Sequence, residues 1–138
     1  MRRLARPLSV LILTVGLWTP ANLALGQTRI LYIIAAEGVT LTRQDVKDVF
    51  LGKKYFSGSI KLVPAANMVG LDEFLHKVLN LTPNQLEAVW NKKAFRDGVM
   101  SPRVLRSDTA MIEFIKQTPG AVGYVTTTPI GVNVIHTY

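Results

Sequence analysis

Cysteine is absent from the 138-residue chain, and histidine occurs only twice. Without cysteine the chain can form no disulfide bond and has no thiol nucleophile. His76 and His136 lack a second histidine at ligand spacing, and the sequence contains no G-x-S-x-G motif and no Walker loop. We therefore expect a protein that is not an enzyme, with no catalytic residue, no metal site and no cofactor.

Long runs of like charge are also missing, although the chain carries a net charge of +7. Three of its 16 basic residues are Arg2, Arg3 and Arg6, so the remainder has 13 basic and nine acidic residues, a net charge of +4. The longest basic runs there are the pairs Lys53–Lys54 and Lys92–Lys93. Such scattered charge is typical of a solvated surface and does not indicate a nucleic-acid partner.

The first 26 residues have the pattern of a secretory signal peptide. A basic head precedes an apolar stretch from Leu8 to Trp18, and small residues follow up to Gly26. An uncleaved membrane anchor is the alternative, but Pro7 and Pro20 interrupt a stretch shorter than the roughly 20 residues of a span. We predict residues 1–26 as signal peptide and 27–138 as one periplasmic or secreted domain, without stable membrane insertion after cleavage. No cysteine for lipid attachment follows the cleavage site.

Hydrophobic periodicity in the remaining chain predicts alternating strands and helices. Strands are expected at 29–36, 60–64, 121–125 and 131–138, with helices that begin after Thr42, near Leu71, after Thr82 and after Ser107. Thr42 with Asp45, and Thr82 with Gln85, have capping-box spacing. Segment 95–107, which holds one glycine, one proline and three arginines, shows no period and is predicted as a loop. The fold class is therefore α/β, a single-domain α/β sandwich on a mixed sheet.

Apolar positions also predict which face of each helix is buried. The expected buried residues are Val46, Val49, Phe50, Leu71, Phe74, Leu75, Val78, Leu79, Leu86, Val89, Trp90, Ala94, Met111, Phe114 and Ile115.

Three segments are candidates for ligand binding. The stretch "LVPAANMVGLDEFL" (62–75) reads as a strand that turns through Gly70 into a helix, a geometry that aims backbone N–H groups at an anion. The loop "FLGKKYFSGS" (50–59) is either a sugar or anion platform or a loop that buries its aromatic residues. The segment 95–107 contains three arginines and is either an anion site or a solvated connection.

The segment from Leu41 to Val125 resembles the phosphate-binding-protein-like family of periplasmic solute-binding proteins. The resemblance rests on "VFLGK" (49–53), on the helix start "LTP" (81–83) with Trp90 and Phe95, and on "SD" (107–108) through "PGAVGYV" (119–125). It implies a type II periplasmic-binding fold, here about one lobe of it, and a relation to the component that delivers phosphate to ABC importers.

In that family the strand-to-helix turn carries an arginine followed by Ser-Gly-Thr. Here only Gly70 keeps the pattern, because Val69 and Leu71 stand where the hydroxyls would be and Ala65 stands near the arginine position. Asn67 is the one polar side chain left in the turn. The predicted ligand-binding residues are therefore Asn67, Val69, Gly70 and Leu71, with a small phosphate-like anion held weakly. Two N–H groups and a helix dipole fall short of the roughly 8 kcal/mol that micromolar affinity requires.

Two functions follow as hypotheses. The first is an exported, non-enzymatic solute-binding-like protein related to phosphate importers, with an ABC permease as a possible partner. The second is an interaction module that keeps the fold without a ligand and binds another envelope protein or itself, because the apolar turn "MVGL" (68–71) suits a protein contact.

Overall fold

The computed structural model describes residues 29–138, so the predicted signal peptide lies outside the described residues. Strands are β1 (Tyr32–Ala35), β2 (Phe56–Ser57), β3 (Ile60–Lys61), β4 (Val63–Asn67), β5 (Arg103–Leu105), β6 (Ala121–Val125) and β7 (Asn133–Thr137). Helices are α1 (Arg43–Phe50), α2 (Leu71–Phe74), which continues as the π-helix η1 (Leu75–Leu79), α3 (Pro83–Asp97) and α4 (Asp108–Gln117).

Five strands form one mixed sheet in the order β5-β4-β6-β1-β7, and β2 and β3 form a separate hairpin. β4 runs parallel to both β5 and β6, whereas β1 is antiparallel to β6 and to β7. The α/β class with a mixed sheet, predicted from the sequence, is confirmed. The parallel direction places the carboxyl ends of β4, β5 and β6 at one edge of the sheet.

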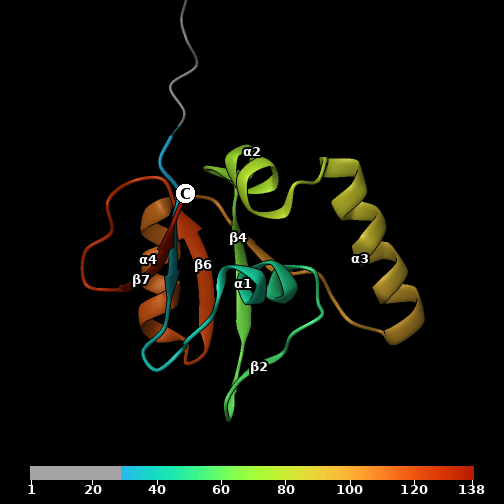
Figure 1. Cartoon of the computed structure of the whole chain (residues 1–138), viewed down its shortest axis with the longest axis horizontal. Helices are drawn as coiled ribbons and strands as arrows, with labels where there is room; N and C mark the ends of the chain where they lie inside the picture. The colour runs from blue at the N-terminus through green and yellow to red at the C-terminus, as the bar shows by residue number, and fades with distance from the viewer. Residues whose placement is uncertain (1–28) are drawn as a thin grey trace, which may run out of the picture.

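Helices cover both faces of this sheet, as the alternation of side chains along β6 shows. Gly123 faces α4, and a Cβ added to it would collide with the Met111 side chain. Tyr124 points to the other face, where its ring stacks on Phe74 of α2 with centroids 4.1 Å apart. Phe50 of α1 meets Phe74 edge-on at 4.6 Å. The domain is thus a three-layer sandwich with α4 on one side and α1 and α2–η1 on the other (Figure 1).

Capping explains where two of the helices begin. The Thr42 hydroxyl accepts a hydrogen bond from Asp45 N, and the Asp45 carboxylate accepts one from Thr42 N. Thr82 and Gln85 form the same reciprocal pair at the start of α3. Both capping boxes predicted from the sequence are confirmed, as are the buried positions Val46, Val49 and Phe50 on α1.

Three sequence predictions of local structure were wrong. Segment 95–107 is not one loop, because α3 extends to Asp97 and β5 forms from Arg103 to Leu105. The predicted strand 60–64 is not one strand, because Ile60–Lys61 form β3, which pairs with β2 in a hairpin, and Val63 begins β4. Ala94 is exposed on α3, where a buried position was expected. Short edge strands escape periodicity because three residues cannot establish an alternation.

Helix α3 stands apart from the rest of the domain (Figure 1). Trp90 is its only buried residue, while Leu86 and Val89 are partly buried. The Trp90 ring lies against Gly52, where an added Cβ would come within 2.9 Å of the indole. Within residues 29–138, α3 is therefore attached mainly through one tryptophan, and most of its other side chains are exposed.

Candidate functional site

The carboxyl ends of β4 and β6 and the start of α4 meet at one edge of the sheet, the usual place for ligands in open α/β folds. β4 ends with Asn67, β6 is followed by Thr126 and Thr127, and α4 begins at Asp108 after its cap Ser107. We call Asn67, Asp108, Tyr124, Thr126 and Thr127 the strand-end cluster.

Asn67 is fully buried, and its side chain is bonded within the protein. Its Nδ2 donates to Asp108 Oδ1 at 2.7 Å and to the Tyr124 carbonyl at 3.2 Å. Its Oδ1 accepts from the Val69 N–H at 3.0 Å. In return, the Tyr124 hydroxyl donates to the Asn67 carbonyl at 2.9 Å. Asn67 thereby ties β4 to β6 and α4.

The Asp108 carboxylate is the anion of this cluster. Its Oδ2 accepts from the N–H and hydroxyl of Thr126 at 3.1 and 3.0 Å, and from those of Thr127 at 3.0 and 2.9 Å. Together with Asn67 Nδ2, five donors converge on one carboxylate. Backbone and hydroxyl donors that could hold a phosphate group are thus bonded to a carboxylate of the chain itself.

These contacts stabilise the ionised form of Asp108. Burial raises the pKa of the Asp108 carboxyl, but the hydrogen bonds from Thr127, Thr126 and Asn67 together outweigh it, and the pKa lies below its ordinary value of 3.8. Burial also raises the pKa of the Tyr124 phenol. At neutral pH the cluster therefore contains a neutral tyrosine and a negative aspartate.

The lowered pKa of Asp108 makes the free energy of unfolding depend on pH. The folded state favours the ionised carboxylate, so Asp108 contributes to the free energy of unfolding. This contribution is fully present at pH values above 3.8, the ordinary pKa that the carboxyl has in the unfolded chain. It is lost as the pH falls through the lower pKa of the folded state. Urea unfolding of the protein and of Asp108→Asn, measured from about pH 6 down to about pH 2, should show a stability difference that is constant above about pH 4.5 and shrinks below it. A difference that does not change with pH would contradict this assignment.

The other residues predicted to bind an anion lie beside the cluster. Gly70 has a left-handed φ of 85°, and an added Cβ would come within 2.5 Å of the Thr126 methyl group, so only glycine fits there. The Leu71 N–H makes a long 3.5 Å contact with the Met68 carbonyl. Val69 and Leu71 are partly buried, and the neighbouring Met68 is 58% exposed.

A cavity of about 290 Å³ opens between the sheet and α3. The floor comes from Ala66 of β4 and Val104 of β5, and the walls come from α2–η1 and from Leu86 and Trp90 of α3. Of the described residues that line it, Glu87 is the only charged one. The cavity is therefore an apolar space that Tyr124 also lines, and among the described residues it shares no other member of the strand-end cluster.

The two other candidate segments from the sequence do not converge on one site. Arg96 pairs with its neighbour Asp97 at 3.1 Å, and the Arg103 guanidinium lies 6.0 Å from the centre of the Phe114 ring. The loop 50–59 leaves Tyr55 and Phe56 exposed, at 44% and 53%. Burial of both aromatic residues, one of the two interpretations of this loop, is therefore wrong.

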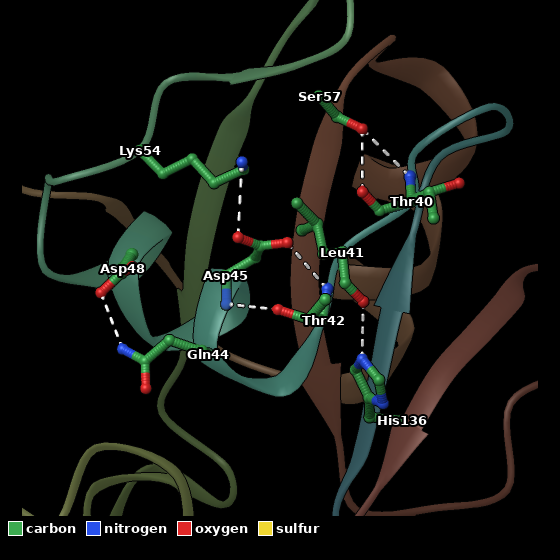
Figure 2. A network of polar contacts seen from close by, with 9 residues as sticks. All are labelled: Thr40, Leu41, Thr42, Gln44, Asp45, Asp48, Lys54, Ser57 and His136. Carbon is green, nitrogen blue, oxygen red and sulfur yellow. Dashed lines mark hydrogen bonds and ion pairs between the residues drawn. The ribbon is translucent and has the colours of Figure 1, made fainter.

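A second polar network holds the segment between β1 and α1 (Figure 2). His136 Nε2 lies 2.7 Å from the Leu41 carbonyl, and the Ser57 hydroxyl donates to the Thr40 carbonyl at 2.9 Å. Lys54 pairs with Asp45 at 3.4 Å. His136 thus links β7 to the start of α1, and among residues 29–138 no group of three or more acidic or histidine side chains could hold a metal ion.

Known structures with this fold include a phosphate receptor. The crystal structure of an ABC-type phosphate transport receptor from Vibrio cholerae superimposes with a TM-score of 0.55 at 15% identity, over 78% of this chain and 46% of the receptor. The chain therefore has an α/β fold that resembles part of a phosphate-binding protein, and its match spans about half of that receptor. No protein-family model and no curated protein sequence matches the chain. No helix among the described residues is long and apolar enough to cross a membrane.

Sequence reasoning missed Asp108, Thr126 and Thr127 as site residues. Asp108 lies 41 positions from Asn67 and 18 from Thr126, so no local spacing connects them. The available signal was topological: a polar residue at the end of each of two predicted strands, and an aspartate that opens a helix. That signal needs the strand order, which the sequence does not contain.

Proposed function

We propose that this chain is an exported, non-enzymatic binding domain on the phosphate-receptor fold that takes apolar side chains of another envelope protein into the cavity beside α3. The observation that carries the proposal is the cavity itself. At about 290 Å³ it lies at the lower limit of small-molecule sites, and its lining is apolar apart from Glu87 and a few neutral polar groups. A space of this size and character suits the anchor side chains of a partner.

A phosphate-like anion at Asn67–Gly70 is the alternative function, and the charge of the strand-end cluster argues against it. Two like charges about 5 Å apart repel by about 3 kcal/mol at an effective dielectric constant of about 20. A helix N-terminus stabilises an anion near the surface by only about 0.3–1 kcal/mol. The Asp108 carboxylate would therefore outweigh the attraction of the Gly70 turn.

Calorimetry and a fluorescent probe distinguish the two functions. The chain from Gln27 to Tyr138, which retains all described residues, should give no saturable heat with inorganic phosphate. The neutral dye Nile red should bind with one-to-one stoichiometry, because its enhanced emission reports an apolar environment. Ala66→Phe, which fills the cavity floor, should abolish dye binding, and Ala88→Phe on the exposed face of α3 should not.

The opposite pattern would overturn the proposal. If the monomer bound phosphate with saturable heat and one-to-one stoichiometry, and Gly70→Asp abolished that heat, the result would support the function of anion binding. Dye binding that persists in Ala66→Phe would show that the cavity does not take apolar groups.

A further inference from the structure

Two similar sequence runs lie next to each other in the folded domain. "KKYF" (53–56) follows α1, and "KKAF" (92–95) lies in the second half of α3. The contact of Trp90 with Gly52 joins them, and the Lys93 side chain also lies against Gly52, within 3.0 Å of an added Cβ. Figure 1 shows the loop after α1 reaching toward α3. We call Lys53, Tyr55, Phe56, Lys92, Lys93 and Phe95 the basic–aromatic patch.

Little of the positive charge of this patch is neutralised by ion pairs among residues 29–138. Among residues 29–138, Lys53, Lys92 and Lys93 take part in none of the four ion pairs. Lys54 is paired with Asp45, and Arg96 with Asp97, so these two add little net charge. Lys53 and Lys92 are therefore exposed cations without an ion-pair partner among the described residues, whereas Lys93 is partly buried and its charge is partly balanced by Asp97.

The aromatic residues of the patch are unusually exposed. Phe95 is 96% exposed, so its ring has almost no contact with the rest of the described chain, and Tyr55 and Phe56 are about half exposed. Met100, just beyond α3, is 87% exposed. The four exposed apolar side chains Tyr55, Phe56, Phe95 and Met100 leave apolar area in water, and covering that area would be favourable.

We propose that the basic–aromatic patch binds the surface of an anionic phospholipid bilayer. Lysines beside exposed phenylalanine rings are the combination found in interfacial membrane binding, where cations meet anionic headgroups and rings enter the boundary with the acyl chains. A fluid bilayer accommodates a single protruding ring, whereas a protein partner needs a preformed pocket for it. This inference does not depend on the cavity and stands independently of the proposed function.

Vesicle co-sedimentation tests the proposal. The chain Gln27–Tyr138 should pellet with vesicles of about 30% phosphatidylglycerol in phosphatidylcholine, and should stay in solution with pure phosphatidylcholine. About 0.5 M NaCl should release it, because salt screens exposed charges. Each lysine removed should weaken binding about fivefold, so Lys92→Gln with Lys93→Gln should weaken it about 25-fold. Phe95→Ser should weaken it about tenfold.

The opposite edge of the sheet offers a matched control. Ile130 is 83% exposed, and the neighbouring Gly131 lies against Lys116, so this region also combines an apolar side chain with a lysine. Ile130→Ser and Lys116→Gln should leave vesicle binding unchanged. Because all the substituted side chains are at least partly exposed, the thermal midpoints of the variants should stay within a few degrees of the unsubstituted chain.

Three results would overturn the proposal. The first is failure to bind anionic vesicles, and the second is equal loss of binding in the patch and control variants. The third is binding to polyglutamate or to single-stranded DNA at lower concentration than to vesicles, since either would assign the patch to an acidic protein or a nucleic acid.

Discussion

Replacing Gly120 by alanine should lower the free energy of unfolding by about 3–5 kcal/mol, the largest effect expected for a single methyl group in this domain. Gly120 has a left-handed φ of 78°, and an added Cβ would overlap the backbone carbonyl oxygen of Lys61. A backbone atom cannot move aside as a side chain can. The Gly120 carbonyl also accepts from Val63 N at 2.9 Å, so any shift there disturbs the β4–β6 pairing. Urea unfolding followed by circular dichroism measures the loss.

Gly98→Ala separates the steric part of this effect from the conformational part. Gly98 also has a left-handed φ, 65°, but no atom of residues 29–138 lies within 4 Å of an added Cβ. Gly98→Ala should therefore lower the free energy of unfolding by only about 1–2 kcal/mol, the cost of the left-handed conformation for alanine. If Gly98→Ala and Gly120→Ala lowered the free energy of unfolding equally, the collision with the Lys61 carbonyl would not add to the cost at Gly120.

Asp108→Asn should destabilise the domain by about 2–4 kcal/mol at neutral pH, although it changes one atom. Both oxygens of the Asp108 carboxylate accept hydrogen bonds. Oδ1 accepts from Asn67 Nδ2, and Oδ2 accepts from Thr126 and Thr127. An amide presents one oxygen and one NH₂ group. Whichever way it is turned, its NH₂ faces donors, so at least one buried donor loses its acceptor. Chemical denaturation at neutral pH measures the change.

Glu113→Gln is the matched control for the loss of a carboxylate. Glu113 also lies in α4, but its side chain is 56% exposed and only 4.0 Å from Lys116. Exposed pairs of this kind contribute about 0–1 kcal/mol. If Asp108→Asn were no more destabilising than Glu113→Gln, the strand-end cluster would not stabilise the fold as described.

Much of the fold could be predicted from local pattern. The capping boxes at Thr42 and Thr82 fixed where α1 and α3 begin, and the periodicity of Val46, Val49 and Phe50 identified the buried face of α1. These signals act within one or two helical turns, so the sequence displays them directly. The three-residue strand β5 displays no such signal, because it becomes a strand only by pairing with β4.

The candidate site could be predicted only in part. Sequence reasoning found the turn at Asn67 and Gly70, and the structure places both at the carboxyl end of β4. It could not find that Asn67 bonds inward to Asp108, or that Thr126 covers Gly70, because those partners come from other elements. Whether Asn67, Val69, Gly70 and Leu71 bind a ligand stays a prediction.

By itself the sequence determined the α/β class, the helix starts and the apolar composition of the Gly70 turn, since each depends on residues close together in the chain. Only the tertiary structure decided that an aspartate of the chain occupies the donors at the strand ends. It also decided that α3 is held by Trp90 and that two lysine–phenylalanine runs adjoin. Those features depend on strand order and on contacts across tens of residues, which no local pattern encodes.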